Sequence, residues 1–235
     1  MARSGQDQPL DFIAVFDDPA AAAKYHEGPR RFVPGFEALH RMTAILLAEG
    51  TRHDAHVLVL GTGGGLELRA LAEAQPEWTF VGVDPAKEML LQAERTLGPL
   101  MERVTLVQGY IDDAPAGPFD AATCLLTLHF LEGVERQATV RSIHQRLRSR
   151  APFVAAHTSF PQEQGERERW LGRYEAYALA SGAEPETARK ARLAVDASLP
   201  ALSPGDDAAI LREGGFTDVA LFYAAFTWRG WIARA

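Results

Sequence analysis

Residues 57–68 read Val-Leu-Val-Leu-Gly-Thr-Gly-Gly-Gly-Leu-Glu-Leu, an apolar run that leads straight into a glycine-rich loop and an amphipathic stretch. This order predicts a buried strand, a tight turn and a helix. Glycines are needed in such a turn when the backbone bends sharply and a ligand touches it directly. Because parallel α/β sheets bind ligands beyond the carboxyl ends of their strands, the loop at Gly61, Gly63 and Gly65 is the predicted ligand site.

Around this loop, apolar runs alternate with amphipathic stretches from residue 55 to residue 157, which is typical of βαβ units. The expected strands are 56–60, 79–83, 104–107, 119–125 and 153–156, and the expected helices between them are 66–74, 87–97 and 135–147. A further helix is expected at 204–212, with Ser203 as its N-cap before Pro204. The last strands, 219–223 and 226–233, lie close enough in the chain to form an antiparallel hairpin. The predicted class is therefore α/β, with a seven-stranded Rossmann-like sheet that ends in this hairpin.

Changes in composition and hydrophobic pattern divide the sequence into four parts. Residues 1–50 form an N-terminal gate and a helix, and residues 51–159 form the ligand-binding core. Residues 160–200 interrupt the alternation with a polar, Arg/Glu-rich helical insertion, which we expect to act as a lid. Residues 201–235 supply the closing helix and hairpin of the core.

Composition excludes several classes of protein. The 235 residues are 47% hydrophobic and 23% charged, which excludes a disordered or fibrous chain. The 24 basic and 31 acidic residues give a net charge of −7, so the chain as a whole lacks the cationic surface that grips nucleic acid. The single cysteine, Cys124, excludes a disulfide framework and a Cys-rich zinc site, and no metal is expected. Without a membrane span or a secretory signal, we expect a cytoplasmic protein with no membrane partner.

The pattern of the glycine loop narrows the choice of ligand. A dinucleotide fingerprint requires glycine at the sixth position counted from Gly61, where this chain has Leu66, and the Gly-Lys-Ser/Thr of a P-loop is absent. The compact spacing of Gly61, Gly63 and Gly65 suits a nucleoside that carries an amino-acid tail. Asp84, at the end of the second expected strand, is suited to accept hydrogen bonds from both ribose hydroxyls.

A third element follows the expected strand 104–107. Asp112 is placed to accept from an adenine amino group, while Tyr110 or Ile111 packs on the face of the base. The alternative for this acidic segment is a solvated loop with a helix-capping residue.

Together these elements resemble the class I S-adenosylmethionine-dependent methyltransferases over about residues 30–235, including Phe119-Asp120 at the start of the fourth strand. The resemblance implies S-adenosylmethionine as cofactor and S-adenosylhomocysteine as product. The candidate cofactor-binding residues are Gly61, Thr62, Gly63, Gly65, Asp84, Pro85, Met89, Tyr110, Ile111, Asp112, Leu125 and Arg31. For Arg31 the alternative is a solvated arginine at a turn.

One position departs from this family. Its members usually have Asp or Glu two residues before the first glycine, where this chain has Val59. The ammonium group of the ligand is then left to backbone carbonyls or to another acid, such as Glu67.

Three further segments are similar to the carboxy-S-adenosylmethionine-dependent tRNA wobble-uridine carboxymethyltransferases. They are 33–36 (Val-Pro-Gly-Phe), 127–131 (Thr-Leu-His-Phe-Leu) with 135–137 (Glu-Arg-Gln), and 215–216 (Gly-Phe). Members of that family use an arginine of the insertion to bind the extra carboxylate, which corresponds to Arg192. Phe36 and Leu125 stand where that family has Tyr and Asn, so we interpret the likeness as architectural and expect ordinary S-adenosylmethionine.

Methyl transfer from a sulfonium is an in-line displacement that requires mainly positioning and exclusion of water. His129, just past the fourth strand, is the candidate general base, and the alternative is a structural histidine that caps a helix or packs under the lid. The candidate substrate-binding residues are Tyr25, His26, Trp170, Tyr174 and Arg192, although an aromatic stripe on a helix is also typical of core packing.

The sequence therefore predicts methyl transfer to a small-molecule acceptor. A tRNA-modifying (carboxy)methyltransferase and a non-catalytic nucleoside-binding regulatory protein are the alternatives. The aromatics of the insertion and the exposed hairpin edge are compatible with a homodimer.

Overall fold

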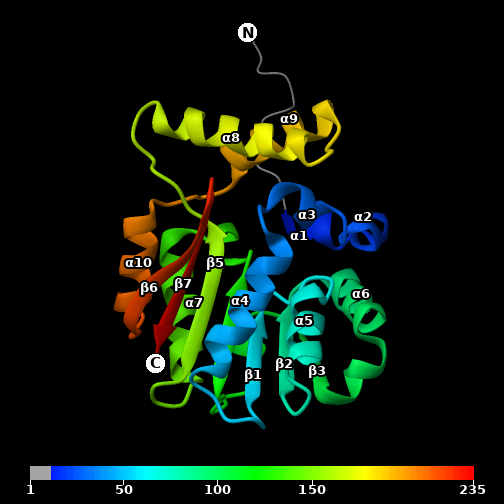
Figure 1. Cartoon of the computed structure of the whole chain (residues 1–235), viewed down its shortest axis with the longest axis vertical. Coiled ribbons are helices and arrows are strands. Elements are labelled where there is room, and N and C mark those ends of the chain that lie inside the picture. Colours follow the sequence, from blue (N-terminus) through cyan, green and yellow to red (C-terminus); the bar gives the residue numbers. More distant parts are fainter. Residues whose placement is uncertain (1–11) are drawn as a thin grey trace.

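The computed structural model describes residues 12–235, and seven strands in this range form one mixed sheet in the order β3-β2-β1-β4-β5-β7-β6 (Figure 1). The strands β1 to β5 run parallel, whereas β7 is antiparallel to both β5 and β6. The predicted fold class is confirmed. The strands are β1 His56–Leu60, β2 Thr79–Asp84, β3 Val104–Gln108, β4 Ala121–Leu125, β5 Pro152–Thr158, β6 Thr217–Ala225 and β7 Trp228–Arg234.

Helices cover both faces of the sheet and its carboxyl end. They are α1 Phe12–Phe16, α2 Pro19–Lys24, α3 Gly28–Phe32, α4 Phe36–Ala48, α5 Leu66–Ala74, α6 Lys87–Leu97, α7 Gly133–Gln145, α8 Glu166–Ala180, α9 Pro185–Ser198 and α10 Pro204–Glu213. Short 3-10 helices lie at η1 Gly98–Arg103, η2 Ile111–Asp113 and η3 Leu128–Phe130. In Figure 1 the α8–α9 pair and the short helices α1 to α3 lie at the end of the molecule where the parallel strands finish.

Alternation of side chains along the buried strands builds two apolar layers. Val57 and Val59 of β1 belong to the cluster that includes Leu39 of α4 and Leu68 of α5. Leu58 and Leu60 face the other way, into the cluster that includes side chains of α7 and α10. Since successive strand residues point to opposite faces, the continuous apolar run at 57–60 is explained by burial on both sides.

The N-cap of α10 was correctly predicted from sequence. The Ser203 hydroxyl accepts a hydrogen bond from the Asp206 amide at 3.2 Å, and Pro204 occupies the first helical position.

Two strand starts were wrong. β4 begins at Ala121, because Phe119 forms only an isolated bridge with Leu147. β7 begins at Trp228, because Phe226 has a φ of +52° and lies in the turn between the hairpin strands. In both places an apolar side chain continues the strand pattern although the backbone has left the ladder.

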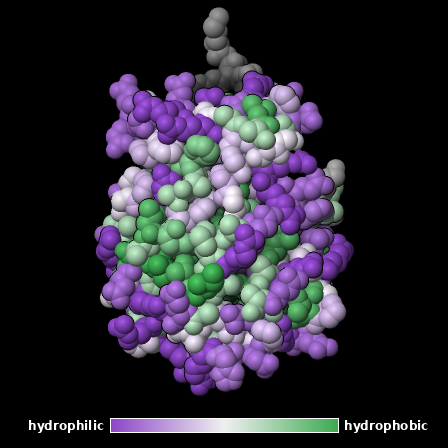
Figure 2. Space-filling view, viewed as in Figure 1, coloured by the Kyte–Doolittle hydropathy of each residue, from purple (hydrophilic) through white to green (hydrophobic). Residues whose placement is uncertain are grey.

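Figure 2 shows one face of the molecule, with hydrophilic side chains over the α8–α9 end and apolar ones over the region of α4 and the β5–β7–β6 side of the sheet. Ile45 of α4 and Leu221 of β6 are exposed. No helix within residues 12–235 combines the length and apolarity needed to cross a membrane. The homodimer stays a prediction.

Candidate ligand-binding site

The loop after β1 has the geometry that its glycines predict. Gly61, Gly63 and Gly65 have φ values of +79°, +50° and +81°, a left-handed backbone conformation that residues other than glycine rarely adopt. A Cβ atom on Gly65 would lie 2.8 Å from the Cα atom of Ala93, so this glycine also allows the start of α5 to approach α6. The loop begins where the Gly61 and Thr62 amides donate to the carbonyl of Val83 on β2.

Asp84 ties this loop to the end of β2. One carboxylate oxygen accepts from the Gly63 amide at 2.8 Å and the other from the Ala86 amide at 3.0 Å. Burial raises the pKa of Asp84, while these two amides oppose the rise. A carboxylate has about four acceptor positions, so this one retains capacity for further donors.

The loop after β3 forms η2, which Asp113 caps by accepting from the Tyr110 amide at 2.8 Å. Ile111 is buried, whereas Tyr110 and Asp112 are exposed. The Asp112 carboxylate lies 3.5 Å from the Ser142 hydroxyl of α7. The loop therefore has the capping acid of the alternative interpretation, and it also presents an exposed acid. The adenine-binding role of Asp112 stays a prediction.

A cavity of about 20 Å³ lies beside the glycine loop. This volume holds roughly one water molecule. The lining residues are Tyr25, Phe36, His40, Gly61, Thr62, Leu66, Glu67, Leu125 and Leu126. The predicted residues Tyr25, Gly61, Thr62 and Leu125 are thus brought together, and Met89 is buried in an adjoining cluster that includes Tyr25. Pro85 is half-buried just after Asp84.

Tyr25 closes the cavity over the glycine loop. A Cβ atom on Gly64 would lie 2.9 Å from its ring, and one on Gly63 would lie 3.1 Å from its hydroxyl. Burial raises the pKa of the Tyr25 hydroxyl, and the acids Asp84 and Glu67 raise it further. The side chain of Phe16 packs edge-on against Tyr25, which holds the N-terminal helices in this closed arrangement.

Replacing Tyr25 by alanine is expected to speed the association of S-adenosylhomocysteine and to tighten its binding by about tenfold. Displacing a buried aromatic ring costs roughly 1.5–3 kcal/mol, and the variant does not have to displace it. Stopped-flow binding measures the effect, with Leu221→Ala on the exposed face of β6 as control. An association rate equal to or below that of the unmodified protein would contradict this function of Tyr25 as a gate.

The other predicted residues of the N-terminal segment do not line this cavity. Arg31 donates to Glu27 at 3.1 Å, and the imidazole of His26 lies 3.9 Å from the same carboxylate. All three side chains are exposed. Their cofactor-binding and substrate-binding roles stay predictions.

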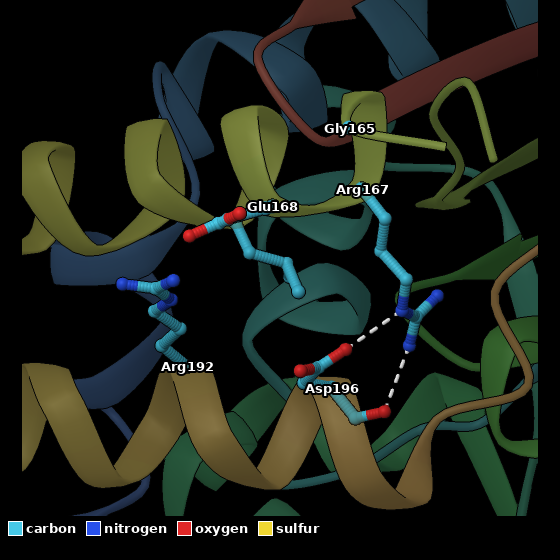
Figure 3. A pocket seen from close by; sticks show the side chains of 6 residues that line it. Gly165, Arg167, Glu168, Arg192 and Asp196 are labelled. Atoms are coloured by element: carbon cyan, nitrogen blue, oxygen red, sulfur yellow. Dashed lines mark hydrogen bonds and ion pairs between the residues drawn. The ribbon is translucent and has the colours of Figure 1, made fainter. Parts of the chain in front are cut away.

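The insertion contains a second hollow, a groove of about 370 Å³ between α8 and α9 (Figure 3). Gly165, Arg167, Glu168, Leu171, Arg192 and Asp196 line it. The guanidinium of Arg192 donates to Glu175 at 3.0 Å, and Arg167 donates to the Asp196 carboxylate at 2.7 Å. Arg192 therefore lies in a groove whose lining differs entirely from that of the glycine-loop cavity.

The two predicted aromatics of the insertion have different surroundings. Tyr174 is buried and stacks on Phe32 of α3 with 5.4 Å between ring centroids, which favours the core interpretation. Trp170 is half-buried, and the guanidinium carbons of Arg173 and Arg229 lie 4.5 and 5.3 Å from the centroid of its ring. Cation–π contacts of this kind fix the indole within the insertion.

His129 lies outside both hollows. It is only 3% exposed, its ring packs against Phe130 and Trp228, and its Nδ1 accepts from the Thr158 amide at 3.3 Å. Burial lowers the pKa of His129 well below its usual value, and the nearby His157 and Arg136 lower it further. The structure therefore favours the structural alternative over the general base, because the group is neutral and sealed from solvent.

Sequence reasoning missed two features. His40 of α4 lines the cavity, and burial lowers its pKa to about 4. Arg136 of α7 forms a fully buried ion pair with Asp207 of α10 at 2.6 Å, and His157 lies 3.1 Å from the same carboxylate oxygen. No local signal connects residues so distant in the chain.

Within residues 12–235 no group of three or more His, Cys, Asp or Glu side chains could hold a metal.

Comparison with known proteins supports the assignment of the core. A family model described as a methyltransferase domain matches residues 57–150. The carboxy-S-adenosyl-L-methionine synthase of Chromohalobacter salexigens is 26% identical over 230 residues, covering 96% of this chain and 85% of the relative.

Solved structures show the same fold at low identity. PigF with SAH superposes with a TM-score of 0.70 at 18% identity, over 99% of this chain, although the chain spans only 64% of PigF. A SAM-dependent methyltransferase from Aquifex aeolicus has a TM-score of 0.61 at 17% identity, over 92% of this chain and 98% of that protein. At these identities the likeness establishes the fold.

Proposed function

We propose that the chain is a class I S-adenosylmethionine-dependent methyltransferase that binds S-adenosylmethionine beside the glycine loop and methylates a small-molecule acceptor. The observation that carries the proposal is the loop of left-handed glycines tied to Asp84. It lies beyond β1 and β2, next to the point where the strand order reverses between β1 and β4. Open α/β sheets bind their ligands at such a switch point.

The residues present fit such a ligand once Tyr25 moves. Asp84 has free acceptor capacity for the ribose, and the buried Ile111 and the cavity-lining Leu125 offer apolar surface for the base. The one mismatch is volume, since about 20 Å³ cannot hold a nucleoside while the tyrosine ring covers the loop. Ligand entry therefore requires the N-terminal helices to shift.

When bound, the sulfonium would supply an already activated methyl group. The tasks left to this chain are to orient the donor and the acceptor and to keep water away. A base is not needed for an acceptor that is already nucleophilic. The buried position of His129 is compatible with this division of tasks.

A small-molecule acceptor is favoured by charge and by the insertion. The net charge of −7 disfavours a polyanionic acceptor such as tRNA. The groove between α8 and α9 has the volume of a small-molecule site and carries both cationic and anionic side chains.

A second candidate is the synthesis of a carboxylated S-adenosylmethionine. The observation in its favour is the match over 96% of the chain to a relative named for that product. Mass spectrometry of the nucleoside after turnover separates the two candidates. Methyl transfer leaves S-adenosylhomocysteine, whereas the synthase, supplied with a co-substrate that donates the carboxyl group, leaves a sulfonium nucleoside that has gained that group. A nucleoside that stays unchanged would favour a regulatory binding protein.

Replacing Asp84 by alanine tests the proposed site. We expect the affinity for S-adenosylhomocysteine in calorimetry to fall at least ~10-fold, because charge-assisted hydrogen bonds of roughly 1.5–3 kcal/mol are lost. The control is Asp54→Ala, since Asp54 is exposed before β1 at the opposite end of the strand. Unchanged affinity in a folded Asp84→Ala variant would refute the ribose assignment, and no binding by the unmodified protein would refute the proposed function.

A further inference from the structure

Glu67 is a buried acid without a positive partner. It lies in the first turn of α5, is 6% exposed and lines the cavity beside the glycine loop. Its Oε1 atom has no hydrogen-bond partner among the described residues. A buried carboxylate normally requires a cation or several donors, so an unsatisfied one in a ligand cavity indicates a group that is completed by a ligand.

No side chain around the cavity supplies that cation. No arginine or lysine among residues 12–235 lines the cavity. His40 of α4 does line it, but its side chain is neutral near pH 7 because burial lowers its pKa to about 4. Tyr25 of α2 and Cys124 of β4 also face Glu67, and burial raises the pKa of both, so they too are neutral. The hydroxyl of Thr123 is the remaining polar neighbour and carries no charge.

The chain also lacks the acid expected at the end of β1. Val59 occupies that position and is completely buried in the apolar core, so it offers the ligand nothing polar. The amide N–H groups of Gly61 and Thr62 donate to the carbonyl of Val83, and an N–H group cannot accept a hydrogen bond from an ammonium group. An amino-acid tail that enters the cavity would therefore meet one acid from α5.

We propose that Glu67 holds the α-ammonium group of the ligand's amino-acid tail, in place of the acid that β1 lacks. This inference rests on the proposed function, because it assumes that an adenosyl amino acid enters beside the glycine loop. It assigns to Glu67 the selection of ligands that carry the amino-acid tail over nucleosides that lack it.

Proton release is a direct consequence. Burial raises the pKa of Glu67 to about 8, with a smaller opposing effect of the Thr123 hydroxyl, so the carboxyl is mostly protonated in the free protein at pH 7. An adjacent ammonium favours the ionised form. Binding then releases about one proton at pH 7, and the apparent affinity rises with pH up to about pH 8.

Calorimetry with two probes tests the proposal on the full chain. S-adenosylhomocysteine carries the amino-acid tail and 5′-methylthioadenosine does not. For the variant Glu67→Gln we expect at least ~30-fold weaker binding of S-adenosylhomocysteine and unchanged binding of 5′-methylthioadenosine, since removing one partner of a buried ion pair is costly. The matched control is Glu73→Gln, an exposed acid on the same helix. Titration in two buffers of different ionisation enthalpy counts the protons released.

The outcomes separate this inference from the proposed function. If the unmodified protein binds neither probe, the proposed function fails. If it binds both and Glu67→Gln loses affinity for neither or for both equally, only the role of Glu67 fails. Should the variant not fold, the unmodified protein still decides: proton release with S-adenosylhomocysteine alone supports the proposal, and no release overturns it.

Discussion

Replacing Asp207 by alanine is expected to lower the free energy of unfolding by about 3–5 kcal/mol, because it leaves the guanidinium of Arg136 buried without its counter-charge. Both side chains are 1% exposed and lie 2.6 Å apart. Arg136 also donates to the carbonyls of Leu131 and Pro200, so it joins α7 to the segment that ends the insertion. Chemical denaturation measures the loss.

The control is a double variant, Arg136→Met with Asp207→Leu. Replacing both partners of a buried ion pair by apolar residues is often neutral or stabilising, so this variant should recover most of the stability. A loss below ~1 kcal/mol in Asp207→Ala would show that the pair is solvated in solution.

Burial acts to raise the pKa of Asp207, but the neighbouring His157 and Arg136 hold this pKa below its usual value. The stabilising contribution of Asp207 is therefore present above pH 4 and lost as the pH falls through the lowered pKa.

The variant Glu67→Gln is expected to change how stability depends on pH. The pKa of Glu67 rises from 4.5 to about 8 on folding, so between these values the folded state binds more protons than the unfolded state. The unmodified protein consequently loses stability as the pH rises from 4.5 towards 8, by on the order of 5 kcal/mol in total at about 1.4 kcal/mol per pH unit. Glutamine does not ionise and removes this contribution.

Urea unfolding at several pH values between 5 and 8 measures the difference between the two proteins. The variant should gain stability relative to the unmodified protein with each step upward in pH, whereas the exposed-site control Glu73→Gln should not. A difference between variant and unmodified protein that is constant with pH would mean that Glu67 is ionised throughout, and would contradict its burial as a neutral acid.

The glycine loop, Asp84 and the hairpin were accessible from sequence because each depends on neighbours within a few residues. A left-handed turn selects glycine at Gly61, Gly63 and Gly65 whatever packs around it. The cap at Ser203 is local in the same way. His129 shows where this reasoning fails, since its position after β4 predicted a rim residue but packing against Trp228 placed it in the interior.

The alternation of apolar and amphipathic segments predicted the succession of strands and helices along the chain and the place of the ligand loop, because residue type and spacing set backbone conformation and burial on both faces of a sheet. The surroundings of that loop depend on contacts between distant segments. Tyr25 comes from α2 to cover Gly64, Arg136 meets Asp207 across two helices, and Glu67 acquires its raised pKa from the side chains that exclude water around it. Burial and charge pairing are properties of the packed chain, so no stretch of sequence carries them alone.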